Sequence, residues 1–94
     1  MAKFQLGQCV CTRGVHELME DNVSFFMFVN KSLQRHQTGD WGDLCDEDKQ
    51  MNDYAVKNGD DRIVSKYKFN GGISIYIITE WDRSYTTILF PEEY

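Results

Sequence analysis

Ten consecutive residues hold most of the side chains in this chain that could do chemistry. The segment from His36 to Cys45 reads H-Q-T-G-D-W-G-D-L-C and contains an imidazole, two carboxylates and a thiol. Its two glycines let the backbone fold tightly, so these groups could converge on one point. Zinc accepts nitrogen, sulfur and carboxylate oxygen ligands in a tetrahedral shell. The segment therefore predicts a structural zinc site, whose ligands would be His36, Asp40, Asp43 and Cys45.

The same residues also have a purely structural interpretation. Asp43 is suited to cap the N-terminus of a following helix, and His36 near a helix C-terminus would interact favourably with the helix dipole. Cys45 is typical of a small buried residue, and Trp41 could close the segment onto a core. The spacing matches no C-x-x-C signature of the kind found in zinc sites. Metal binding and a plain helix junction are therefore alternatives at this point.

A second group of carboxylates surrounds Trp81. Glu80 and Asp82 could pair with Asp40 or Asp43 for acid–base catalysis, and the alternative function is then a small metal-dependent hydrolase that uses the same loop. The chain has no glycine-rich phosphate loop, no nucleophile elbow and no H-E-x-x-H motif. We therefore expect a protein that is not an enzyme and has no catalytic residues.

The other thiols and the second histidine carry a weaker signal. Three cysteines, an odd number, argue against a disulfide framework. Cys9 and Cys11 form a C-x-C pair that is typical of small buried residues. His16 lies between Val15 and Glu17 and is typical of a surface histidine.

The negative charge of the chain is local. The formal net charge is -5, and the segment 40–61 alone holds eight acidic residues and two lysines. Such a segment disfavours nucleic acid and anionic membranes as partners and favours a basic protein surface. Acidic residues in the first turn of a helix also complement its dipole, which explains part of the pattern structurally. The predicted partner-binding residues are Asp46, Glu47, Asp48, Asp53, Asp60 and Asp61.

Length and composition predict one folded domain over residues 1–94. The 41% hydrophobic content is enough for one modest core, and the 27% charged content is ordinary for a protein surface. No apolar run approaches the roughly 18 to 20 residues that span a bilayer, and residues 1–4 lack a signal-peptide core. We therefore expect a cytoplasmic protein.

Hydrophobic periodicity predicts one strand followed by helices. Residues 4–11 are rich in strand formers, and residues 15–20 predict a short helix. Asn22 or Asp21 can cap a longer helix that runs from Val23 to about Arg35. Its apolar stripe comprises Val23, Phe26, Val29 and Leu33, widened by Phe25, Met27 and Phe28. A third helix is expected over residues 44–58, ended by Gly59, with Met51, Tyr54 and Ala55 as its buried face.

The remainder of the chain predicts strands. Residues 63–69 and 73–79 alternate with period two around an Asn-Gly-Gly turn, which indicates a β-hairpin. Residues 85–90 form a last strand before Pro91, which cannot extend a central ladder. We therefore expect an α+β fold, with an antiparallel sheet of about four strands packed against two or three helices.

Four motifs carry a resemblance to a known family. They are L-G-Q at 6–8, R-H-x-x-G-D-W-G-D-L-C at 35–45, E-D-K at 47–49 and I-I-T-E-W-D-R-S-Y-T-T-I-L-F-P-E-E-Y at 77–94. They resemble a family of small uncharacterised proteins from bacteria, plasmids and phages, described as plasmid-related or as restriction-modification subunits. Members of this family often have alanine in place of Trp81 and lack thiols at Cys9 and Cys11.

The resemblance implies a protein of mobile genetic elements in a host cell. Some small acidic phage proteins that look like this one are anti-CRISPR inhibitors of RNA-guided nucleases. The expected function is therefore inhibition of a host nuclease, or of another basic nucleic-acid-binding protein, by a monomer or weak dimer that contacts neither nucleic acid nor membrane itself.

Overall fold

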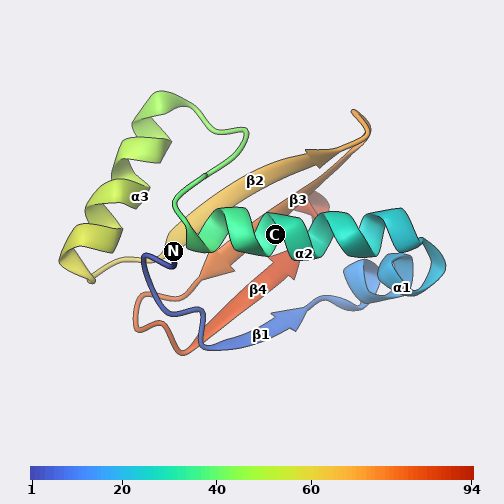
Figure 1. Ribbon diagram of the computed structural model, residues 1–94, viewed down its shortest axis with the longest axis horizontal. Coiled ribbons are helices and arrows are strands. Elements are labelled where there is room, and N and C mark those ends of the chain that lie inside the picture. The colour runs from blue at the N-terminus through green and yellow to red at the C-terminus, as the bar shows by residue number, and fades with distance from the viewer.

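A four-stranded sheet and three helices make up the fold, which confirms the predicted α+β class. The computed structural model describes residues 1–94 (Figure 1). The elements in chain order are β1 (Gln8–Cys11), α1 (Arg13–Asp21), α2 (Val23–Gln37), α3 (Asp46–Asn58), β2 (Ile63–Phe69), β3 (Ile73–Thr79), β4 (Tyr85–Leu89) and a 3-10 turn (Pro91–Glu93). No helix of this chain is long and apolar enough to cross a membrane.

The sheet has the strand order β1-β4-β3-β2. The predicted hairpin is confirmed, because β2 and β3 pair antiparallel from Ile63 opposite Thr79 to Phe69 opposite Ile73. β4 pairs antiparallel with β3, whereas β1 pairs parallel with β4, so the sheet is mixed. β1 is shorter than predicted and begins at Gln8, because backbone carbonyls of the preceding residues bind side chains: that of Phe4 accepts from Gln37 and that of Leu6 from Thr86.

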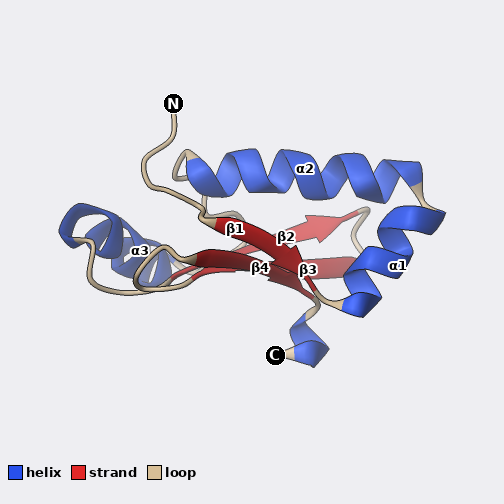
Figure 2. Ribbon diagram, turned by 90° about the horizontal axis from the view of Figure 1, so that it is seen from below, coloured by secondary structure: helices blue, strands red, loops and turns tan.

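The helices divide into two groups. α2 lies across one face of the sheet, with α1 at its end, while the C-terminal 3-10 turn lies on the other side (Figure 2). α3 lies apart from the other helices, beside β2 (Figure 1). The larger core cluster fills the space between α2 and the sheet and includes Phe25, Val29, Ile75 and Ile77. A smaller cluster of Trp41, Ala55 and Ile63 lies between α3 and the sheet.

The buried face of α2 differs from the predicted stripe. The helix starts where expected, because the side chain of Asn22 accepts from the N–H of Phe25 at 3.1 Å. However, Val23, Phe26 and Met27 are exposed, and the buried residues are Phe25, Val29, Ser32 and His36. These four follow one another at the four-, three- and four-residue steps of a single helix face. Hydrophobicity alone misses this face, since half of its residues are polar.

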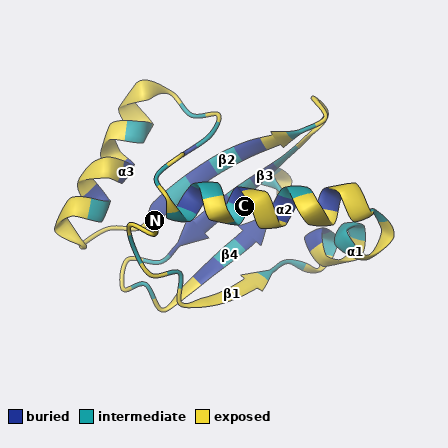
Figure 3. Cartoon of the chain, viewed as in Figure 1, coloured by how far each residue is buried: buried dark blue, intermediate teal, exposed yellow.

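The buried face of α3 also differs from the prediction. Gly59 ends the helix in the left-handed conformation as expected, at φ 68°. Most of α3 is exposed, as Figure 3 shows. Met51 and Tyr54 are exposed, at 60% and 65%, and the buried residues are Asn52 and Ala55. The cause is the position of α3 at the edge of the sheet, where a single narrow strip of the helix reaches the core. The prediction that Asp43 caps this helix is wrong too, because Cys45 occupies the N-cap position and makes no side-chain bond there.

Candidate functional site

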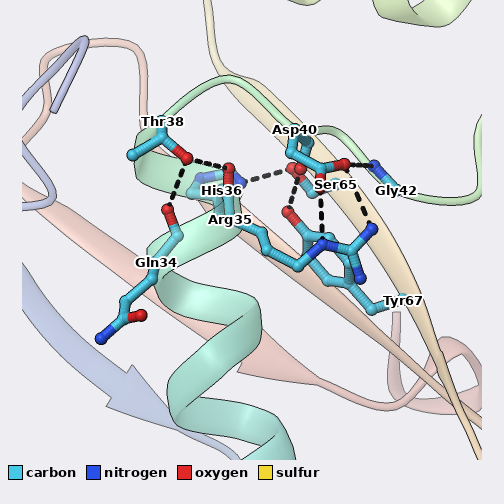
Figure 4. A network of polar contacts seen from close by, with 8 residues as sticks. All are labelled: Gln34, Arg35, His36, Thr38, Asp40, Gly42, Ser65 and Tyr67. Carbon is cyan, nitrogen blue, oxygen red and sulfur yellow. Dashed lines mark hydrogen bonds and ion pairs between the residues drawn. The ribbon is translucent and has the colours of Figure 1, made fainter. Parts of the chain in front are cut away.

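His36 lies in the last turn of α2 and is completely buried. Its Nδ1 atom lies 2.5 Å from the hydroxyl of Ser65 in β2 (Figure 4). Its Nε2 atom lies 2.9 Å from the hydroxyl of Thr79 in β3. The Thr79 hydroxyl in turn lies 2.7 Å from that of Thr86 in β4. The imidazole therefore joins the helix to β2 and β3, and the threonine pair extends the network to β4.

The direction of every proton in this network follows from its far end. The Thr86 hydroxyl donates its one proton to the carbonyl of Leu6 at 2.7 Å, so it accepts from Thr79. Thr79 has then used its own proton and accepts from Nε2–H of His36. The remaining nitrogen, Nδ1, accepts from Ser65. His36 is thus a neutral imidazole with its proton on Nε2.

Burial lowers the pKa of His36 to about 3, which agrees with this neutral assignment. The serine–histidine contact resembles that of an activated nucleophile. Ser65 and His36 are both fully buried, however, so a substrate has no access to either group in this conformation. The network therefore has a structural role in this conformation: it attaches α2 to the sheet.

The depressed pKa predicts loss of stability in mild acid. The pKa of His36 is about 6.5 in the unfolded chain and about 3 in the folded protein. Below about pH 6.5 the unfolded state therefore binds a proton that the folded state does not bind. We expect the free energy of unfolding to fall by about 1.4 kcal/mol per pH unit from pH 6.5 downward. Urea unfolding at pH 7, 6 and 5 measures this slope.

The second histidine supplies the control for this experiment. His16 is exposed, so His16→Gln should leave the slope unchanged. Equal stability of the wild-type protein at pH 7 and pH 5 would contradict the assignment of a buried neutral imidazole. At still lower pH, protonation of Asp40 and Asp82, whose pKa values are lowered in the folded protein, adds to the loss of stability. The range from pH 7 to 5 therefore isolates the effect of His36.

Asp40 is held by Arg35 rather than by His36. The Nε and Nη2 atoms of Arg35 donate to the two carboxylate oxygens at 2.7 and 3.2 Å, and the guanidinium lies 4.7 Å from the ring centroid of Tyr67 (Figure 4). The Tyr67 hydroxyl donates to the backbone carbonyl of Asp40 at 2.6 Å. The hydrogen bonds between Arg35 and Asp40 lower the pKa of the carboxyl group and raise the pKa of the guanidinium. Burial raises the pKa of Tyr67. The carboxylate therefore stays ionised and engaged.

The rest of the loop between α2 and α3, residues 38–45, covers the outer edge of β2. The N–H of Lys66 donates to the carbonyl of Trp41 at 3.2 Å, and the N–H of Asp43 donates to the carbonyl of Lys66 at 2.7 Å. Gly42, at φ 77°, lies between these two bonds and opposite Lys66. The loop thus acts as a short additional strand, and it protects the edge from pairing with other chains.

α3 is attached to the same edge. The amide of Asn52 donates to the carbonyl of Val64 at 2.7 Å and accepts from its N–H at 3.2 Å, which replaces both bonds of a neighbouring strand. The indole N–H of Trp41 donates to the carboxylate of Asp53 at 2.9 Å. Two side-chain attachments, one to β2 and one to the loop, therefore help to set the orientation of α3.

The four predicted zinc ligands are not brought together. Both ring nitrogens of His36 and both oxygens of Asp40 have protein partners. Asp43 lies 3.9 Å from the ammonium of Lys68, and Cys45 is exposed at the start of α3. No group of three or more His, Cys, Asp or Glu side chains in the chain is placed to hold a metal ion. Zinc binding stays a prediction, and it would require His36 to give up a hydroxyl partner and Asp40 to leave Arg35.

All six predicted partner-binding acids are exposed on or just after α3. We call them, together with Met51 and Tyr54, the acidic face; the acids are Asp46, Glu47, Asp48, Asp53, Asp60 and Asp61. Asp53 also accepts the hydrogen bond from the indole N–H of Trp41, so it has a structural role as well. A shallow cavity lined by Met51, Tyr54 and Asp61 adjoins this face. Met51 and Tyr54 are thus exposed, not buried as predicted, and a signal for their exposure is the scarcity of further apolar residues in this helix.

Arg83 links the β3–β4 turn to the acidic face. Its guanidinium donates to the carbonyl of Asp61 at 2.6 Å and to that of Ala55, at the end of α3, at 3.1 Å. Trp81 in the same turn is 63% exposed. The predicted pairing of Glu80 or Asp82 with the His36 loop is not among these contacts, because the turn binds the C-terminal end of α3 instead.

Comparison of the chain with protein-family models, with curated proteins and with solved structures finds no match. The family suggested by the motifs is therefore still a prediction, and the functional proposal below depends on the geometry of the acidic face.

Proposed function

We propose that this chain is a non-enzymatic inhibitor that binds, through the acidic face, a basic surface of a nucleic-acid-handling protein. The partner class that we favour is an RNA-guided nuclease, which makes the chain an anti-CRISPR protein. The observation that carries the proposal is the exposure of Met51 and Tyr54 on α3, which is held at the sheet edge and carries four of the six carboxylates, with the other two just after it.

Each part of the acidic face suits such an interaction. Aromatic residues and methionine are enriched in the centres of protein interfaces, where they supply most of the binding energy. Carboxylates around them complement the lysines and arginines with which a nuclease holds a phosphate backbone. Attachment of α3 at the β2 edge presents these groups on a preorganised helix, which lowers the entropy cost of binding.

The test is binding to a panel of purified RNA-guided nucleases loaded with guide RNA. We expect binding that weakens between about 50 and 200 mM salt, as for other charge-driven contacts. Tyr54→Ala should weaken binding by about 2 kcal/mol, which is roughly thirtyfold, if Tyr54 is an interface anchor. Reversal of Asp46, Glu47 and Asp48 to lysine should weaken binding and reduce the salt dependence.

α1 offers a matched control for the charge reversal. Glu17, Glu20 and Asp21 are likewise three exposed acids of one helix, outside the acidic face, and their reversal to lysine changes the net charge equally. Circular dichroism verifies that each variant is folded. Equal losses in the two triple variants would show that net charge rather than the acidic face drives binding. Absence of binding to every nuclease in the panel would contradict the anti-CRISPR assignment.

A further inference from the structure

A cavity of about 440 Å³ lies between α2 and the end of the β2–β3 hairpin, away from the acidic face. Nine residues line it, and three of them are the cations Lys31, Arg35 and Lys68. None of the nine is a carboxylate. In a chain with a net charge of -5, this is a local reversal of sign, and it favours an anionic ligand.

The positive charges of this cavity are only partly neutralised within the protein. Lys31 makes no ion pair, and the ammonium of Lys68 lies 3.9 Å from its nearest carboxylate, that of Asp43. Arg35 binds Asp40 through Nε and Nη2, which leaves its Nη1 without a protein partner. The cavity therefore retains charge and donors for a ligand.

Ser32 supplies a second and independent indication of a ligand. It also lines the cavity, it is 1% exposed, and its hydroxyl is the single buried side-chain polar atom of the protein without a hydrogen-bond partner. A buried hydroxyl without a partner costs free energy, and such groups in folded proteins call for an explanation. Arg35 follows Lys31 by four residues and Ser32 by three, so its side chain is a neighbour of both on α2.

We propose that this cavity binds the phosphate group of a small phosphate ester, which is neutralised by Lys31 and Lys68 and, after a local movement that uncovers Ser32, accepts a hydrogen bond from its hydroxyl. The half-buried rings of Phe28 and Phe69, whose centroids are 5.1 Å apart, form an apolar wall beside the cations. A phosphate carried on a flat aromatic body, as in a nucleoside monophosphate, matches this combination of charge and apolar surface. The site does not depend on the function proposed for the acidic face.

The test is a titration of isotope-labelled protein with adenosine monophosphate and with inorganic phosphate, followed by NMR at constant ionic strength. We expect saturable shifts of the amides of Ser32 and Asn70, with tighter binding of the nucleotide. Ser32→Ala should weaken binding about tenfold, because a hydrogen bond to a charged group is lost. The same variant should not lower the melting temperature, since it removes an unsatisfied buried hydroxyl.

Two lysine variants separate a specific site from general charge. Lys31→Gln should weaken binding, whereas Lys57→Gln, which removes an exposed lysine of α3, should not. The proposal is overturned if the shifts equal those caused by sodium chloride, or if Ser32→Ala binds like the wild-type protein. Tighter binding of an oligonucleotide than of the mononucleotide would overturn it in favour of a nucleic-acid backbone. A lower melting temperature of Ser32→Ala with unchanged affinity would assign the hydroxyl a structural role.

Discussion

Replacement of His36 with alanine is expected to lower the free energy of unfolding by about 4 kcal/mol. The substitution removes a completely buried ring and leaves a cavity between α2 and the sheet. It also removes the partner of Ser65 and the donor to Thr79, both of which are fully buried. Each hydroxyl that loses its partner adds the cost of an unsatisfied polar group. Urea unfolding at pH 7 measures the loss.

Two further variants serve as controls for this result. His16→Ala removes the exposed histidine of α1 and should change stability by less than about 0.5 kcal/mol. The triple variant His36→Leu, Ser65→Ala, Thr79→Val replaces the ring and both hydroxyl partners with apolar groups, so it should recover part of the loss. A loss in His36→Ala no larger than that in His16→Ala would contradict the hydrogen-bonded network. Failure of the triple variant to recover stability would assign the loss to the cavity alone.

Replacement of Gly42 with alanine should cost about 3 kcal/mol or more. The residue has φ 77°, a conformation that favours glycine, and an added methyl group would collide with the carbonyl oxygen of Lys66 and with the ring of Tyr67. Relief of this collision requires the loop to move away from β2. The attachment of Trp41 to α3 should then loosen, so we expect weaker partner binding as well as lower stability. Thermal unfolding and the nuclease-binding assay measure the two effects.

Gly59 provides the matched control for this substitution. It has a similar φ of 68°, but no atom lies near the position of an added methyl group. Gly59→Ala therefore incurs the backbone strain without the collision, at a cost of about 1 kcal/mol. The difference between the two variants measures the contact of the loop with β2. Equal stability losses would show that this contact has little importance for the fold.

Local signals predicted most of the secondary structure. The period-two pattern and the Asn-Gly-Gly turn located β2 and β3 to the residue, because a hairpin is specified by its own turn and by its alternating faces. Asn22 and Gly59 marked helix ends, since caps act on backbone groups three or four residues away. The parallel pairing of β1 with β4 had no such signal, because its partners are more than seventy positions apart in the chain.

The candidate site was predicted only in part. The local acidity of residues 40–61 identified the charged part of the acidic face, since charge can be counted without knowledge of the fold. The exposure of Met51 and Tyr54 could not be predicted from composition. A helix with several apolar residues can bury either of two strips, and the choice depends on where the sheet lies. Asn52 decides it here by binding the edge of β2.

By itself, then, the sequence determined the α+β class, the hairpin, the main helix and the site of the negative charge. The tertiary structure decided what the residues from His36 to Cys45 do. As an isolated list they are good ligands for zinc, but the groups that engage His36 lie 29 and 43 positions away, in β2 and β3. Hydrogen-bond partners that are distant in the chain and close in space determine whether an imidazole is free to bind a metal, because each ring nitrogen can serve only one partner.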